Sequence, residues 1–129
     1  MKHYLWNMIT SIKNGQLSKK SIIYQRRKKI CESFLKILWD EGFISGYSIS
    51  KKDNNKFQIY LKYTKHGDPV IRSFKFLSKP SKRFYYSSKQ LWKLDSSKVF
   101  LILSTDQGLM TINDCKKKNI GGEPIVVIK

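Results

Sequence analysis

Alanine is absent from this sequence, and acidic residues are scarce. Nine Asp and Glu residues stand against 26 Lys and Arg, which gives a formal net charge of +17 over 129 residues. Such a surplus disfavours an isolated compact protein through self-repulsion, and a polyanionic partner relieves it. The positive charge is spread along the whole chain, with no separate basic tail. This distribution favours a globular protein surrounded by polyanion over a flexible basic arm, and we expect nucleic acid as the partner before an acidic membrane surface.

Long apolar runs and cysteine pairs are also missing. No stretch approaches the roughly 18 apolar residues of a membrane-spanning helix. Residues 1–6 lack the apolar core of a secretory signal, and no amphipathic transit peptide is visible. The two cysteines, Cys31 and Cys115, have no neighbours at metal-ligand spacing. We therefore expect no membrane association, no disulfide framework and no metal site.

Catalytic patterns are not apparent either. The carboxylates form no obvious acid–base pair, and neither His3 nor His66 has a motif around it. The glycine patterns of a P-loop or a dinucleotide fold do not occur, and Ser104 has no accompanying Asp and His arrangement of a nucleophile. The sequence thus argues against an enzyme, and we expect no cofactor and no small-molecule substrate.

Apolar periodicity predicts the elements of the first half. A helical stripe predicts a helix over residues 3–13, which Asn14-Gly15 should end, and a second helix that ends at Gly42. Strands are expected at residues 21–24, 43–49, 57–63 and 70–77. We interpret residues 1–77 as an N-terminal lobe with two helices on one face of a small sheet.

A polar segment around Pro80 marks the boundary to a second lobe, residues 78–129. The elements expected there are strands at 83–86, 98–103, 109–112 and 124–128, a helical turn at 90–94 and a short helix at 113–119. This lobe should be mostly antiparallel β with a short helix. The predicted fold class of the whole chain is therefore α+β.

Two basic segments are candidates for nucleic-acid contact. Lys28 and Lys29 lie at the basic start of the second predicted helix. Lys79, Lys82 and Arg83 precede three aromatic residues, Phe84-Tyr85-Tyr86. Cations that alternate with rings suit RNA, because cations contact phosphates while rings stack on bases or sugars. The alternative is that the rings belong to the core and the lysines are only solvated; for Tyr85 the two interpretations are balanced.

The stretch from Val99 to Glu123 is the most informative. Five apolar residues, 99–103, predict a buried strand. The following segment 104–108 holds small hydroxyl residues and a glycine, which leave N–H groups and hydroxyls uncovered for phosphates and sugars. The alternative is an ordinary strand–turn–strand that uses Ser and Gly for its turn.

These residues carry a resemblance. Ser104-Thr105-x-x-Gly108-x-Met110-Thr111, followed by Gly121-Gly122-Glu123, resembles the C-terminal signature of the family of the eighth protein of the small ribosomal subunit. Three earlier segments resemble that family in the same order: Ile12-Lys13-Asn14, Glu41-Gly42-Phe43-Ile44 and Ser78-Lys79-Pro80-x-x-Arg83-x-Tyr85. The resemblance implies a structural ribosomal protein. Its implied partners are the central domain of the small-subunit RNA, whose assembly it supports, and neighbouring ribosomal proteins.

The resemblance also implies which residues contact RNA. Together with Lys28 and Lys29, the expected set is Lys13, Asn14, Lys79, Pro80, Arg83, Tyr85, Ser104, Thr105, Asp106, Gly108, Met110, Thr111, Gly121, Gly122 and Glu123. The expected mode is shape recognition, because side chains cannot read the narrow A-form major groove. Gly121-Gly122 would let backbone approach RNA closely. Asp106 stands where the family usually has Ser, and its carboxylate would repel phosphate.

Residue usage bears on the source. The chain has no Ala, 22 Lys and four Arg, which an AT-rich gene would encode. Organellar genomes often show this bias, so we expect a mitochondrial matrix ribosome, with a plastid or the bacterial cytoplasm as alternatives. Two competing functions stay open: a free-standing RNA-binding translational regulator, and a peripheral protein on acidic lipids.

The charge predicts a steep salt dependence of RNA binding. Each neutralised phosphate releases counterions, so the log of the affinity should fall by roughly 0.7 to 0.9 per neutralised phosphate for each log unit of salt. A filter-binding titration across salt concentrations measures this slope. A slope near zero would exclude an electrostatic RNA interface.

Overall fold

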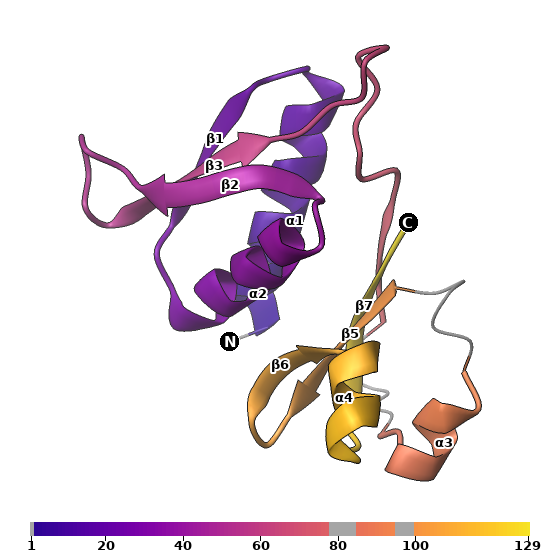
Figure 1. The fold of residues 1–129 in the computed structure, drawn as a ribbon. Helices are drawn as coiled ribbons and strands as arrows, with labels where there is room; N and C mark the ends of the chain where they lie inside the picture. The colour runs from indigo at the N-terminus through magenta and orange to yellow at the C-terminus, as the bar shows by residue number, and fades with distance from the viewer. Residues whose placement is uncertain (1, 78–84, 95–99) are drawn as a thin grey trace. The chain divides into compact units, whose positions relative to one another are not determined.

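The computed structural model describes residues 2–77, 85–94 and 100–129, which Figure 1 draws as helices and strands. The chain divides into two compact units, unit 1 (Met1–Arg72) and unit 2 (Ser73–Lys129). We expected the boundary after residue 77. It lies earlier, because the strand just after Arg72 pairs within the second sheet and not the first.

Unit 1 combines two helices with a three-stranded antiparallel sheet of strand order β1-β3-β2. Its elements are α1 (Lys2–Leu17), β1 (Ile22–Arg26), α2 (Lys29–Asp40), β2 (Ile44–Ile49) and β3 (Lys56–Leu61). Helix α1 contacts β1, β3 and α2, and α2 contacts β2. Fully buried side chains such as Met8, Phe34 and Phe57 join the helices to the sheet. The expected helices-on-sheet arrangement is confirmed.

Helix α1 is longer than the sequence predicts. It continues through Asn14-Gly15 to Leu17. The backbone changes to a left-handed conformation only at Lys19, whose φ is +55°. Gly15 is buried against β1, where a Cβ atom would lie 2.6 Å from Cγ2 of Ile23. Glycine thus serves close helix–strand packing here. Local sequence rules treat Asn-Gly as a stop signal and cannot see that packing.

Helix α2 ends where the sequence predicts. Gly42 has φ +79°, and its N–H donates to the carbonyl of Trp39 while the N–H of Phe43 donates to that of Leu38. Glycine adopts this left-handed conformation without a Cβ penalty, which is why it terminates helices so often.

Unit 2 holds a four-stranded antiparallel sheet of order β4-β7-β5-β6 and two short helices. Its elements are β4 (Phe74–Phe76), α3 (Ser88–Trp92), β5 (Phe100–Thr105), β6 (Gly108–Thr111), α4 (Ile112–Lys118) and β7 (Glu123–Ile128). Its core cluster is Leu91, Leu101, Leu103, Met110, Ile112 and Cys115. The α+β class and the β-rich second unit are confirmed.

Two expected strands of this region differ. The strand predicted at 70–77 is only β4, and it pairs with β7 of unit 2, so it is not the third strand of the first lobe. Alternation predicts a strand but does not say which strand it pairs with. Of the strand predicted at 83–86, residues 83 and 84 lie outside the described residues. Tyr86 forms an isolated antiparallel bridge with Gly122.

Capping residues explain where the short helices begin. Ser87 and Gln90 form a capping box on α3, in which each side chain bonds the other residue's N–H. Thr111 caps α4, its hydroxyl accepting from the N–H of Asp114 at 3.2 Å. Across the described ranges, no helix has both the length and the apolar character to cross a membrane.

The close approach at Gly15 predicts the effect of a methyl group. Gly15→Ala should lower the free energy of unfolding of unit 1 by about 1 kcal/mol, because overpacking costs about 1–3 kcal/mol and the gain in helix propensity returns only about 1 kcal/mol. Urea unfolding followed by circular dichroism measures the change. Asn14→Ala, at the adjacent exposed position, is the control and should be neutral or stabilising. Equal stability gains for both variants would contradict this account of the helix.

Candidate nucleic-acid interface

The β5–β6 hairpin presents the turn that the sequence singled out. Its register pairs Ser104 with Leu109 and Thr105 with Gly108. Gly108 has φ +104°, and a Cβ atom there would meet nothing within 4 Å. Asp106, Gln107 and Gly108 are exposed, and Ser104 is half-buried. The tip of the hairpin is therefore open to a partner.

The hydroxyl of Thr105 is used inside this turn. It donates to the carbonyl of Gly108 at 2.8 Å, accepts from the N–H of Gln107 at 3.1 Å, and lies 3.3 Å from the sulfur of Met110. We expected this hydroxyl to contact sugar or phosphate. The structure shows that it fixes the turn, because each of its hydrogen bonds joins two residues of the hairpin.

Met110 and Thr111 face inward. Their side chains are only 7% and 5% exposed, with Met110 in the core cluster and Thr111 capping α4. The sequence assigned both to the contact surface. In the structure both side chains are buried and support the hairpin and the start of α4 from inside the unit.

Gly121 and Gly122 sit at a close crossing of backbone. Gly122 and Tyr86 exchange two backbone hydrogen bonds, of 2.8 and 2.9 Å. A Cβ atom at Gly121 would collide with the carbonyl oxygen of Tyr86, and one at Gly122 would lie 2.8 Å from the carbonyl oxygen of Ser104. We expected these glycines to admit RNA; the close approach they allow is to the backbone of their own unit.

The remaining expected residues of unit 2 lie around this crossing. Glu123 is opposite Ser104 in the β5–β7 register. Tyr85 is 67% exposed, and the edge of its ring would be 3.2 Å from a Cβ atom at Gly121. Lys79, Pro80 and Arg83 lie outside the described residues. Tyr85 is thus the exposed aromatic side chain next to the two glycines.

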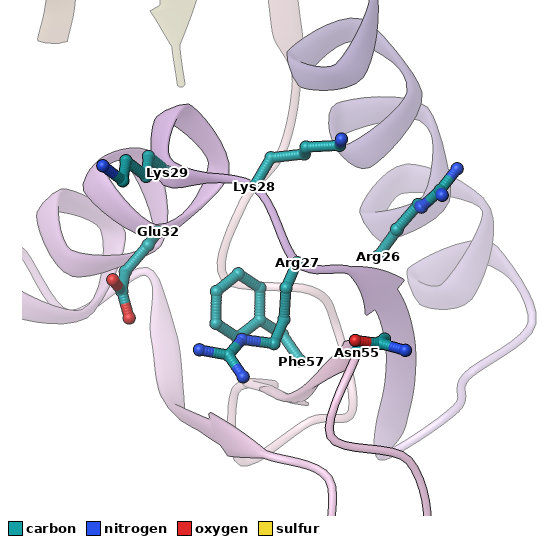
Figure 2. Close-up of a pocket in the computed structure, with 7 residues that line it drawn as sticks. All are labelled: Arg26, Arg27, Lys28, Lys29, Glu32, Asn55 and Phe57. Atoms are coloured by element: carbon teal, nitrogen blue, oxygen red, sulfur yellow. The ribbon is translucent and has the colours of Figure 1, made fainter.

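Unit 1 contains an open basic hollow of about 450 Å³ (Figure 2). We call it the basic hollow, and its lining residues are Arg26, Arg27, Lys28, Lys29, Glu32, Asn55 and Phe57. Four consecutive cationic residues line it, from the end of β1 to the start of α2. Glu32 is the one carboxylate in this lining. Figure 2 shows Phe57 and Asn55 reaching the hollow from β3 and from the turn before it.

Two of these cations, Arg27 and Lys28, are held in place by contacts within the unit. The guanidinium of Arg27 donates to the carbonyl of Asn54 at 2.7 Å and lies 5.9 Å from the centre of the Phe57 ring. The ammonium of Lys28 lies 4.5 Å from the centre of the Tyr4 ring. Cation–π contacts of this kind orient a charge without neutralising it. The hollow therefore presents ordered positive charge.

Sequence reasoning found this surface only in part. It selected Lys28 and Lys29; the neighbouring Arg26 and Arg27 belong to the same charge run and could have been included. Asn55 and Phe57 carry no local signal, because they reach the hollow only through tertiary contacts: Phe57 pairs with Gln25 of β1, and the carbonyl of Asn55 accepts from the N–H of Arg27. Lys13 and Asn14 are exposed near the end of α1 but do not line the hollow.

The described residues do not support a metal site or a reactive thiol. Among the described residues, His, Cys, Asp and Glu nowhere gather in a group of three that could hold a metal ion. Burial raises the pKa of both Cys31 and Cys115, and the nearby Asp114 carboxylate raises that of Cys115 further. A raised pKa disfavours the reactive thiolate, and both cysteines are buried and pack as small apolar residues.

The fold and these surfaces define a class: a small, strongly basic α+β protein of two units, with an open cationic hollow in unit 1 and an exposed hairpin tip in unit 2. The family model described as "Ribosomal protein S8" matches residues 4–128. The chain belongs to the ribosomal protein S8 family, as the resemblance in the sequence indicated.

The chain is similar to proteins of about the same length. The chain is 37% identical to "Small ribosomal subunit protein uS8" of Azorhizobium caulinodans over 95% of this chain and 93% of that protein. It is 38% identical to the protein of the same name of Ehrlichia chaffeensis, over 91% and 89%. It is 36% identical to "Small ribosomal subunit protein uS8c" of Chlorella vulgaris, over 91% of each chain.

The buried cap predicts a stability effect at Thr111. Thr111→Val keeps the volume but removes the hydroxyl that caps α4, so unfolding of unit 2 should become easier by about 0.5–2 kcal/mol. Urea unfolding gives the value. Thr111→Ser retains the cap and should restore part of the stability, while RNA affinity per folded molecule should be unchanged in both variants. Full stability combined with weakened RNA binding in Thr111→Val would make Thr111 a contact residue after all.

Proposed function

We propose that the chain binds the RNA of the small ribosomal subunit through two surfaces, the basic hollow of unit 1 and the exposed tip of the β5–β6 hairpin in unit 2. Membership of the ribosomal protein S8 family makes the chain a ribosomal protein and a structural constituent of the small subunit. The neighbouring ribosomal proteins of that subunit are its further partners in this proposal.

The observation that carries the proposal is the gathering of four consecutive cations around the basic hollow, two of which, Arg27 and Lys28, are held by aromatic-ring and backbone contacts of their own unit. An RNA backbone carries closely spaced phosphates, and several fixed cations bind it with a smaller loss of side-chain freedom than mobile ones. Arg27 and Lys28 already rest on aromatic rings and face an open surface. Glu32 restricts where a phosphate can bind in the hollow, because its carboxylate repels the phosphate.

The hairpin tip suits shape recognition. Its exposed residues include Gly108, where the backbone is uncovered, and Asp106, whose carboxylate repels phosphate. A tip of this composition is best matched by sugar hydroxyls and base amino groups in the wide, shallow minor groove of A-form RNA. Because Thr105 fixes the turn from within, the tip arrives at the RNA in one conformation.

We further propose that the ribosome is organellar and the compartment the mitochondrial matrix. What supports this is the AT-rich residue usage, with no Ala and 22 Lys. The relatives named above include bacterial proteins and a chloroplast protein. Family membership therefore supports localisation to a ribosome, and the choice of compartment rests on residue usage alone. Immunodetection across purified mitochondrial, plastid and cytosolic ribosome fractions tests the compartment. Signal in the free protein pool alone would favour the regulator alternative.

The basic hollow predicts the effect of removing two of its cations. Lys28→Ala with Lys29→Ala should weaken binding to a transcript of the central domain of small-subunit RNA, equally for altered base sequences. The salt slope should flatten by about one unit for each phosphate that the variant no longer neutralises, because these lysines contact backbone. Filter binding at several salt concentrations measures both effects.

A matched pair separates the hollow from general charge. Lys62→Ala with Lys65→Ala removes two exposed lysines of the same unit that do not line the hollow. This control should change affinity much less. Equal reductions in affinity for the two double variants would show that net charge alone drives binding. Unfolding of the Lys28 and Lys29 variant would show that their stems pack against the unit.

A further inference from the structure

Helix α3 holds a tryptophan on the surface of unit 2. Trp92 is 58% exposed, although the preceding residue, Leu91, is fully buried and anchors the helix in the core cluster. More than half of this large side chain is open to solvent. An indole in this position is available to a partner.

The ring is held before any partner arrives. Its Nε1–H donates to Oδ1 of Asn119 at 3.4 Å, and the ammonium of Lys116 lies 5.6 Å from the ring centre. Both of these partners are themselves fixed. Lys116 donates to the carbonyl of Leu94 at 2.7 Å, and Asn119 is the C-cap of α4 with φ +54°. A ring ordered in this way loses little conformational freedom when another ring stacks on it.

The charge around Trp92 selects the kind of partner. Lys89 and Lys93 flank it on α3 and at the α3 C-cap, and α4 contributes Lys116, Lys117 and Lys118. Within α3 and α4 as described, Asp114 in the first turn of α4 is the one acidic residue. Aromatic rings among cations fit a nucleotide, whose base stacks while its phosphate meets an ammonium group.

Trp92 also lies in the same unit as the hairpin tip, with α4 in contact with both α3 and β6 (Figure 1). The ammonium of Lys118 on α4 lies 3.5 Å from Oε1 of Gln107 in the hairpin turn. Trp92 and the tip are thus both linked directly to α4. An RNA segment that extends from the tip along α4 would therefore reach Trp92.

We propose that Trp92 is a stacking site for an unpaired base of the bound RNA. This inference rests on the proposed RNA-binding function and adds the class of ligand and the residue that receives it. A base pair inside a helix already stacks on its neighbours, so the site is specific for a nucleotide in a bulge, loop or single strand.

Fluorescence tests the stacking directly. Trp6→Phe with Trp39→Phe leaves Trp92 as the one tryptophan, since the chain has three. The probes are a transcript of the central domain of small-subunit RNA and a fully paired RNA duplex of equal length. Stacking of a base should strongly quench Trp92 emission with the transcript and leave it nearly unchanged with the duplex.

Affinity supplies the second measurement. Trp92→Ala should weaken binding to the transcript about 5- to 150-fold, the range for removal of one stacked base, while Trp92→Phe should retain most of the affinity. Affinity for the duplex should be the same in all three proteins. If Trp92→Ala does not fold, the quenching experiment decides alone, because it keeps the ring.

The contrary results are distinct. Unchanged emission with bound transcript, or equal reductions of affinity for transcript and duplex in Trp92→Ala, would overturn the stacking site while leaving RNA binding intact. Failure of the wild-type chain to bind the transcript at all would overturn the proposed function itself.

Discussion

The pair of backbone hydrogen bonds between Tyr86 and Gly122 is the contact on which the candidate interface of unit 2 depends. It holds the segment that leads into α3 against the residues that lead into β7. Side chains would prevent it, because a Cβ atom at Gly121 or Gly122 would collide with backbone oxygens. Tyr85, the β5–β6 hairpin and α4 all adjoin this crossing, so their relative positions are set by two residues that have no side chain.

Much of the segment that resembles the family signature supports the hairpin from inside and is not itself part of the exposed surface. The hydroxyls of Thr105 and Thr111 bond within the hairpin and at the α4 N-terminus, and Met110 is in the core. What remains exposed is the tip, with Asp106 and Gly108. Such internal support favours recognition by shape, because a loop that already has its bound form loses less conformational freedom on binding.

The sequence predicts most elements well where the signal is local: the amphipathic helix α2, its glycine stop at Gly42, and the hairpin around Gly108. It fails where tertiary contacts decide. Asn14-Gly15 looks like a helix end, but Gly15 instead serves packing against Ile23. Likewise the partner of β4, and the arrival of Phe57 beside Arg27 in the basic hollow, depend on strand pairing that no local pattern encodes.

The order of strands in the second sheet has a consequence for synthesis. Strand β7 lies between β4 and β5, so two earlier strands of the chain are joined only by a later one. On a translating ribosome, β4 and β5 must wait without this partner until β7 emerges, a delay on the order of seconds at usual rates of elongation. Unit 1 includes no residue beyond Arg72 and faces no such wait. The two surfaces therefore become available at different times, the basic hollow before the hairpin.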